Sequence, residues 1–132
     1  MEKRIVVGVA SIVKNEILLL KRHEGQQIIF GGYWSIVTGD REENEAPFVA
    51  AGRELLEETG FKCKAWDLNY CYAWDDDRLN LKFYLYRYDL QERLIPVLDF
   101  EHTDYKYIHR DNLESVSPMD DVLRNNLSYL FV

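Results

Sequence analysis

The first third of the chain alternates short apolar runs with polar or turn-forming residues, a pattern typical of β-strands. Residues 5–13 form a near-continuous apolar run rich in valine and isoleucine, as expected for a strand that is covered on both faces. Residues 14–15 indicate a turn, and residues 16–21 indicate the second strand of a hairpin. Residues 22–27 are polar and predict a loop, whereas residues 33–37 predict another short strand.

The second half of the chain continues this pattern. Residues 68–74 predict a strand, and the consecutive aspartates at 75–77 predict the turn of a hairpin. Residues 78–88 alternate most regularly, which places every second side chain on one face of a sheet. Residues 105–109 predict the last strand.

Two helices complete the predicted elements. The first begins near Ala46 or Pro47, because proline is tolerated in the first helical turn, and it ends at Gly60. After a single helical turn at 111–116, a terminal helix is predicted to run from Ser117 as N-cap through Tyr129. Strands combined with one central and one terminal helix predict an α/β domain with layers around a mixed sheet.

The central helix separates acidic from apolar positions. At about 3.6 residues per turn, Glu54, Glu57 and Glu58 share one face and lie within an arc of roughly 100°. The opposite side is predicted to be buried and carries Phe48, Gly52, Leu55 and Leu56. Three neighbouring carboxylates repel one another, and a divalent cation such as Mg²⁺ would remove that repulsion. A solvated acidic face is the alternative interpretation.

Composition limits the classes of partner. With 132 residues, 47% hydrophobic and 14% aromatic, the chain is expected to form one folded domain over residues 1–132. A net charge of −7 argues against nucleic-acid and anionic-membrane binding. Cys63 and Cys71 indicate free thiols in a reducing cytoplasm, and neither a signal peptide nor a membrane-spanning stretch is expected.

The stretch around the acidic helix has a longer pattern. From Gly39 to Phe61 it reads G-x5-E-x7-R-E-U-x-E-E-x-G-U, where U is apolar, and every fixed position is filled. This spacing resembles the Nudix box, the signature of the Nudix hydrolases. The resemblance implies an α/β/α sandwich around a mixed β-sheet, with the box forming a loop and a helix.

The resemblance also implies a metal site and its supporting residues. It implies that Glu54, Glu57 and Glu58 bind Mg²⁺, with Mn²⁺ as a substitute, together with a backbone carbonyl of Thr38 or Gly39. Arg53 and Glu45 are expected to orient the metal-binding glutamates. Glu101 is the candidate for a further metal ligand or general base. The glutamates on the helix are expected to be ionised with ordinary pKa values, and His102 is expected to be structural. The catalytic candidates are Glu54, Glu57, Glu101 and Arg53.

Two further stretches narrow the resemblance. Residues 33–39 and 101–107 are similar to the bacterial dihydroneopterin triphosphate pyrophosphatases, although Tyr107 stands where tryptophan is common. The E-H-x-x-Y element at 101–105 also occurs in diadenosine tetraphosphate hydrolases. Candidates for phosphate contacts are Lys21, Arg22, Arg78 and Lys82, and candidates for stacking on a planar ring include Trp34 and Tyr84.

The prediction is therefore a Mg²⁺-dependent pyrophosphohydrolase that cleaves a nucleoside triphosphate or a related NDP-X compound, with dihydroneopterin triphosphate as one candidate substrate. A dinucleoside polyphosphate hydrolase and a non-catalytic Nudix-like binding module are the two alternatives. The expected partner is a small-molecule phosphoanhydride rather than nucleic acid or membrane, and the sequence leaves a monomer or a homodimer open.

Overall fold

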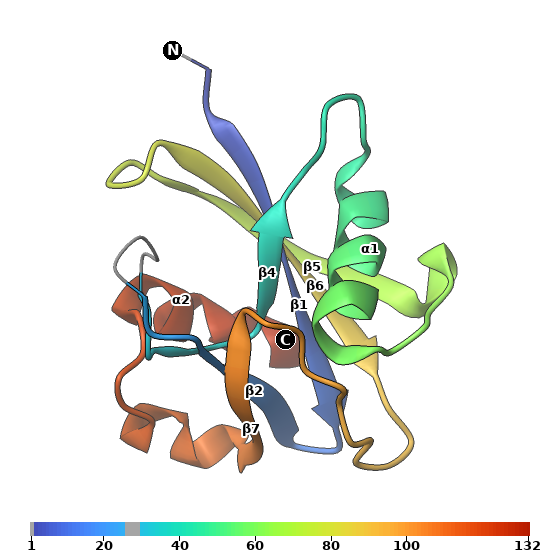
Figure 1. Cartoon of the computed structure of the whole chain (residues 1–132), viewed down its shortest axis with the longest axis vertical. Helices are drawn as coiled ribbons and strands as arrows, with labels where there is room; N and C mark the ends of the chain where they lie inside the picture. Colours follow the sequence, from blue (N-terminus) through green and yellow to red (C-terminus); the bar gives the residue numbers. More distant parts are fainter. Residues whose placement is uncertain (1, 26–29) are drawn as a thin grey trace.

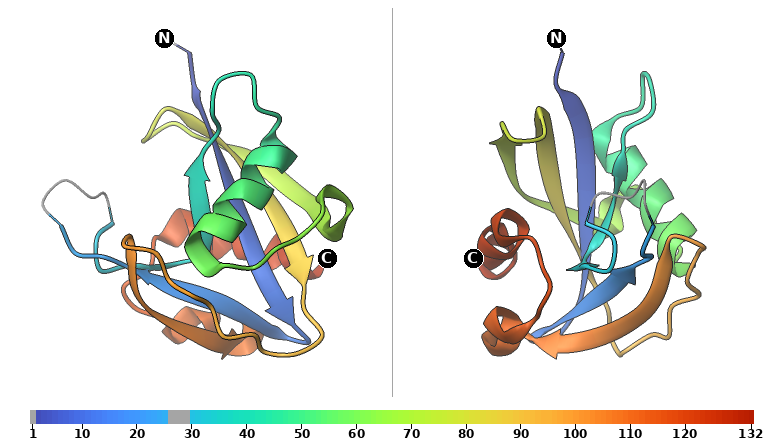
Figure 2. Two further views of the ribbon diagram at one scale, coloured as in Figure 1. Left: turned by 45° about the vertical axis from the view of Figure 1, so that its right-hand side comes forward. Right: turned by 60° about the vertical axis from the view of Figure 1, so that its left-hand side comes forward.

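The computed structural model of this chain describes residues 2–25 and 30–132. These residues form a seven-stranded sheet with helices on both faces. Figure 1 labels the longer elements, and Figure 2 shows α1 on one side of the sheet and the carboxyl-terminal helices on the other. In chain order the elements are β1 (Arg4–Val13), β2 (Glu16–Arg22), β3 (Trp34–Ser35), β4 (Val37–Asp40), α1 (Pro47–Thr59), η1 (Ala65–Asp67), β5 (Leu68–Asp76), β6 (Leu81–Asp89), β7 (His102–His109), η2 (Arg110–Ser115), α2 (Asp121–Asn126) and η3 (Leu127–Phe131).

The sheet is mixed and is built around β1. Strand β6 pairs with β1 in parallel, whereas the other pairings are antiparallel. Along its other edge, β1 pairs first with β4, over Val6–Val9, and then with β2 from Ile12. Two strands therefore share one edge of β1, and the sheet divides at that point (Figure 1).

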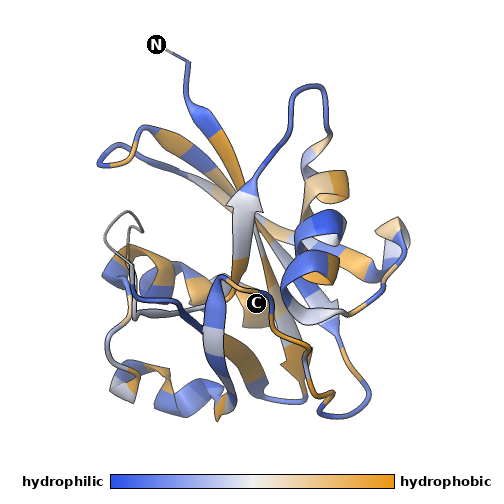
Figure 3. Ribbon diagram, viewed as in Figure 1, coloured by the Kyte–Doolittle hydropathy of each residue, from blue (hydrophilic) through white to orange (hydrophobic). Residues whose placement is uncertain are grey.

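Each face of the sheet has its own core. Val7 and Val9 of β1 pack on the same side as Leu55 of α1, whereas Ala10 and Ile12 pack against the carboxyl-terminal elements. This explains the near-continuous apolar run at 5–13, because both faces of β1 are covered. The loop between β4 and α1 is hydrophilic (Figure 3). No helix among the described residues is long and apolar enough to cross a membrane.

Helix α1 has the boundaries that the sequence predicts. Pro47 occupies its first turn, and Gly60 caps its carboxyl end with φ 78° while its N–H donates to the carbonyl of Leu56 at 2.9 Å. Glycine adopts this left-handed conformation without a steric penalty, so the helix stops there. The helix is therefore held at a fixed length beside β4.

The terminal helix begins later than predicted. Ser117 and Pro118 precede it, and α2 starts at Asp121 with Asp120 as its N-cap. The Asp120 side chain accepts a hydrogen bond from the N–H of Leu123 at 3.3 Å, which satisfies one free donor of the first turn. Aspartate serves this role as well as serine does, so residue type alone does not decide between Ser117 and Asp120. The prediction chose the wrong one.

The hairpin between β5 and β6 also turns later than predicted. The turn occupies residues 77–80, so Asp75 and Asp76 still belong to β5 and Arg78 lies in the turn. Asp76 causes this shift, because its carboxylate accepts the N–H of Arg78 at 3.1 Å and its carbonyl accepts the N–H of Leu79 at 3.3 Å.

Two other strand predictions need correction. The strand at 33–37 is divided, because Trp34 pairs with Lys21 of β2 whereas Val37 pairs with Val9 of β1. Arg22 extends β2 and is not part of a loop. Residues 26 and 27 of the predicted loop lie outside the described residues.

Candidate active site

Arg53 joins the loop before α1 to the helix itself. Its Nε and Nη2 donate to the two carboxylate oxygens of Glu45, each at 2.9 Å. Its Nη1 donates to Glu54 at 2.9 Å and to Glu57 at 3.4 Å, and its Nη2 also reaches the carbonyl of Asp40 at 3.0 Å. The planar guanidinium suits such an arrangement because it carries five donors in fixed directions. One cation therefore sets the positions of three carboxylates.

This contact pattern has electrostatic consequences for Glu45. Hydrogen bonds from Arg53 lower the pKa of the Glu45 carboxyl to about 2, and the N–H of Glu42 adds to the effect. Glu45 thus remains ionised well below neutral pH and keeps Arg53 in place.

Gly39 of β4 leaves the space that the Glu54 carboxylate occupies. A Cβ atom built on Gly39 would lie 2.1 Å from the carboxyl carbon of Glu54 and 2.3 Å from one of its oxygens. Any side chain at this position would displace the carboxylate. The glycine is therefore a cradle for the first glutamate of the helix.

The acidic face of α1 is not uniformly solvated, which corrects the predicted orientation of the helix. Glu58 is only 1% exposed and lies on the buried stripe with Ala51 and Leu55, whereas Phe48 and Leu56 are 44% and 45% exposed. The helix is rotated so that Ala51, Leu55 and Glu58 are buried, whereas Phe48 and Leu56 stay half-exposed.

Burial also corrects the expectation of ordinary pKa values. It raises the pKa of Glu58 well above its usual range, and the nearby Glu54 carboxylate adds to this effect. Burial raises the pKa of Glu54 as well, although Arg53 opposes the shift. Nε2 of His102 lies 3.4 Å from Oε1 of Glu58, and no group in residues 2–25 and 30–132 donates a hydrogen bond to Oε2. A buried carboxylate with an unsatisfied oxygen requires a further partner.

A cavity of about 560 Å³ lies beside this cluster, between the β4–α1 region, the β5–β6 turn and the start of α2. Below it is called the pocket. Charged, aromatic and aliphatic side chains all line it. The lining residues include Arg22, Trp34, Thr38, Gly39, Arg41, Arg53, Glu54, Trp74, Asp76, Phe83, Glu101 and Asp120.

Comparison with protein families decides the assignment. The model of the NUDIX domain matches residues 2–128. The chain belongs to the NUDIX domain family. Among curated proteins, 57 residues of this NUDIX chain are 42% identical to an octanoyltransferase from Myxococcus xanthus, a match that covers 43% of this chain and 15% of that protein.

Solved NUDIX structures share the fold. The E. coli dihydroneopterin triphosphate pyrophosphohydrolase superposes with a TM-score of 0.77 at 21% identity, covering 100% of this chain and 97% of that chain. The NUDIX domain of Shewanella oneidensis NrtR complexed with ADP ribose gives 0.80 at 14% identity over 98% and 87% of the two chains. A C. elegans Ap4A hydrolase gives 0.68 at 18% identity over 95% and 96%.

The pocket of the NUDIX chain gathers about half of the residues predicted for the site. Thr38, Gly39, Arg53, Glu54 and Glu101 all line it, and so do Arg22 and Trp34. Arg22 donates to the hydroxyl of Thr38 at 3.4 Å. The predicted residues that do not line the pocket are Lys21, Glu57, Glu58, Arg78, Lys82 and Tyr84.

Two of these residues lie on the other face of the sheet. Tyr84 packs with the core beneath α1, and the Nζ of Lys82 lies 5.6 Å from the centre of the Tyr84 ring. Phe83, between them in β6, faces the pocket instead, because side chains alternate along a strand. The alternation at 78–88 predicts which side chains share a face of the sheet. It does not predict which of the two faces lines the pocket.

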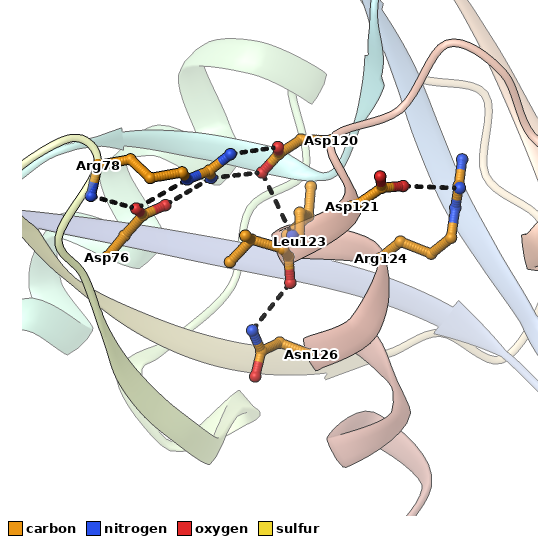
Figure 4. Close-up of polar contacts among 8 residues, drawn as sticks. Asp76, Arg78, Asp120, Asp121, Leu123, Arg124 and Asn126 are labelled. Carbon is orange, nitrogen blue, oxygen red and sulfur yellow. Dashed lines mark hydrogen bonds and ion pairs between the residues drawn. The ribbon is translucent and has the colours of Figure 1, made fainter.

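Arg78 connects two walls of the pocket (Figure 4). Its guanidinium lies 2.7 Å from Asp76 at the end of β5 and 3.1 Å from Asp120 at the start of α2. Both aspartates line the pocket, and the sequence analysis had not singled out either one. No local spacing could link positions 76 and 120, because the contact spans the β6, β7 and η2 segments.

The donor set suits a divalent cation, although the carboxylates are held apart. No group of three or more His, Cys, Asp or Glu side chains in residues 2–25 and 30–132 converges as metal ligands would. Arg53 draws Glu54 and Glu57 toward itself, and the side chain of Glu57 is 53% exposed. The buried Oε2 of Glu58, which accepts no hydrogen bond from the described residues, and the cradle at Gly39 nevertheless fit a hard, oxygen-preferring cation.

Proposed function

We propose that this chain is a Mg²⁺-dependent pyrophosphohydrolase that cleaves a phosphoanhydride bond of a nucleoside triphosphate or a related NDP-X compound. The observation that carries the proposal is the pair formed by Glu54, seated in the Gly39 cradle and lining the pocket, and the buried Glu58, whose Oε2 has no hydrogen bond within the described residues. Two such carboxylates cannot both stay ionised at low cost without a countercharge, and a divalent cation would supply it.

The residues proposed to hold the cation are Glu54, Glu57 and Glu58, with the carbonyl of Thr38 or Gly39 and with Glu101. A bound divalent cation would activate the attacking water and neutralise charge on the phosphate oxygens. Arg53 and Glu45 would hold the helix carboxylates in position. Glu57 and Glu101 are both exposed, and either is able to accept the proton of the attacking water.

The pocket offers separate surfaces to the two parts of such a substrate. Trp34 and the stacked pair Trp74 and Phe83, whose ring centroids are 4.4 Å apart, provide flat apolar surfaces for a heterocycle. Arg22 and Arg41 supply positive charge for phosphates. The products would be a monophosphate and pyrophosphate, or two phosphorylated compounds.

The test is a phosphate-release screen with and without Mg²⁺ across nucleoside triphosphates, dihydroneopterin triphosphate, diadenosine tetraphosphate and nucleotide sugars. Glu57→Gln is expected to lower kcat by at least about 10²-fold while the domain stays folded. Glu114→Gln, on exposed η2, is the matched control and should leave kcat unchanged. Near-normal turnover of Glu57→Gln would contradict the assigned cation site, and inactivity of the wild type across the panel would favour a binding module.

A dinucleoside polyphosphate hydrolase is the second candidate. It is supported by the similarity of the fold to the C. elegans Ap4A hydrolase, whereas the E-H-x-x-Y element at 101–105 fits both candidates. The same panel separates the two, because the second candidate predicts the highest kcat/KM with diadenosine tetraphosphate.

A further inference from the structure

His102 is the nitrogen base that faces the buried carboxylate of Glu58. Its Nε2 lies 3.4 Å from Oε1 of Glu58, and both side chains are only 1% exposed. The charged groups that act on Glu58 from the surrounding elements are acidic: Glu54 on α1 and Asp99 and Glu101 on the loop before β7. Glu58 therefore lies among carboxylates, with one imidazole pointing toward it.

The orientation of the imidazole is fixed from its other side. Nδ1 of His102 lies 2.8 Å from Oδ1 of Asp99, and the backbone N–H of His102 donates to the Asp99 carbonyl at 3.3 Å. The same Asp99 carboxylate oxygen accepts the N–H of Glu101 at 3.2 Å. Asp99 thus holds both the ring and the short turn that presents Glu101 to the pocket.

The contact with His102 distinguishes the two oxygens of Glu58. Whichever of the two groups carries the proton, an imidazole at Oε1 favours one rotation of the carboxylate and leaves Oε2 to another partner. Groups that hydrogen-bond a ligating carboxylate fix its orientation and so affect cation binding. A buried histidine that only fills the core would need a partner such as Asp99 for Nδ1, but it would not need Nε2 to be aligned with Glu58.

We infer that His102 is a positioning residue, held by Asp99, that orients Glu58 toward a divalent cation and couples it to the turn carrying Glu101. This inference rests on the proposed function, because it requires Glu58 to be a cation ligand. It assigns a role to a histidine that was expected from the sequence only to be structural.

Two substitutions separate the two contacts of the ring. In His102→Gln the side-chain amide reaches the place of Nε2 and keeps the contact with Glu58. In His102→Asn the shorter amide takes the place of Nδ1, so it keeps Asp99 and loses Glu58. Both remove the aromatic ring, and asparagine leaves the larger cavity, so a loss of packing alone would lower thermal stability more in His102→Asn. Asp99→Asn keeps the ring and therefore separates lost contact from lost packing. His109→Asn, at a partly exposed histidine that accepts the N–H of Asp111, is the control.

The measurement is the binding of Mn²⁺ alone to the full chain, followed by electron paramagnetic resonance of the free ion, with thermal unfolding recorded in the absence of cation. His102→Asn is expected to weaken Mn²⁺ binding roughly 10-fold or more, the scale found for partners of metal ligands. His102→Gln should stay within about threefold of wild type, by the same comparison. Asp99→Asn, which leaves the ring in place, should also weaken binding and provides the test if His102→Asn does not fold.

The outcomes separate this inference from the proposed function. A wild type that binds no Mn²⁺, or a Glu58→Gln variant that binds it normally, would overturn both. If Glu58→Gln loses affinity while His102→Asn and Asp99→Asn keep it, only the role of His102 is overturned. If Mn²⁺ affinity falls equally in His102→Gln and His102→Asn, and thermal stability falls with it, the contact with Glu58 does not matter. His102 would then contribute only packing.

Discussion

The carboxylate of Glu54 occupies the space that a side chain at Gly39 would need, since a Cβ at residue 39 would lie 2.1 Å from the carboxyl carbon. The atoms in the way are the end of a flexible side chain and not backbone. Substitution should therefore move Glu54 without unfolding β4. Gly39→Ala is expected to fold with near-normal stability and to lose about 10²-fold in kcat, the usual result of misplacing a catalytic group by about 1 Å.

Gly52→Ala is the matched control for this variant. Its nearest neighbours, Cys63 and Leu68, lie 3.9 Å from the added Cβ, and alanine favours the helix over glycine by roughly 0.5–1 kcal/mol. We expect a slightly more stable protein with unchanged kcat. Normal turnover of Gly39→Ala, measured beside this control, would show that the Glu54 position does not matter.

Arg53→Lys should separate charge from geometry. Lysine keeps the positive charge but cannot donate to Glu45, Glu54 and the Asp40 carbonyl at once, because it lacks the planar fork. We expect kcat to fall roughly 10- to 100-fold with a smaller change in KM. Steady-state kinetics beside Arg110→Lys, an exposed position on η2, checks this, and a loss of less than about twofold would contradict it.

Glu45→Gln should change how stability depends on pH. The folded-state pKa of Glu45, about 2, lies below the ordinary value of about 4.3. The unfolded chain therefore binds more protons between these values, so the Glu45–Arg53 contribution is complete above the ordinary pKa and is lost as the pH falls toward the folded one.

The substitution is thus expected to destabilise the protein at neutral pH by roughly 1–3 kcal/mol. The difference from wild type should vanish near the folded-state pKa. Urea unfolding at several pH values, with exposed Glu43→Gln as control, measures this, and a difference that is independent of pH would be evidence against it.

Arg78→Met should reveal how far a partly buried ion pair supports the pocket walls. Asp76 is only 7% exposed and loses its cationic partner, so we expect a loss of roughly 1–3 kcal/mol in the free energy of unfolding. Arg93→Met, whose contact with Glu16 lies at the surface, should cost clearly less, because an exposed ion pair is screened by water and salt. Equal effects in chemical denaturation would mean that Asp76 is adequately solvated.

Features set by neighbours in the sequence were predictable. Pro47 and Gly60 mark the ends of α1, and the apolar run at 5–13 identifies the central strand. The spacing from Gly39 to Phe61 gave the family because it depends on residue identities rather than on a folded arrangement. Local rules were sufficient for these features.

Features that depend on contacts between distant residues could not be predicted from the sequence. The burial of Glu58 depends on how α1 is rotated against the sheet. The hydrophobic residues Phe48 and Leu56 predicted a different rotation, but both are half-exposed. The engagement of Arg78 depends on Asp120, which lies 42 residues away. The start of α2 depended on whether Ser117 or Asp120 caps it, and both residues suit the role.

The division of the sheet along one edge of β1 has a further consequence. Strand β4, which carries Gly39, is hydrogen-bonded to Val6–Val9, whereas the arm that carries Arg22 and Trp34 joins the sheet lower down at Ile12. A change in the length or tilt of that arm would reshape one wall of the pocket while leaving β4 and the acidic helix in register. Under the proposed function, substrate preference could therefore change through this arm without displacing the carboxylates proposed to hold the cation.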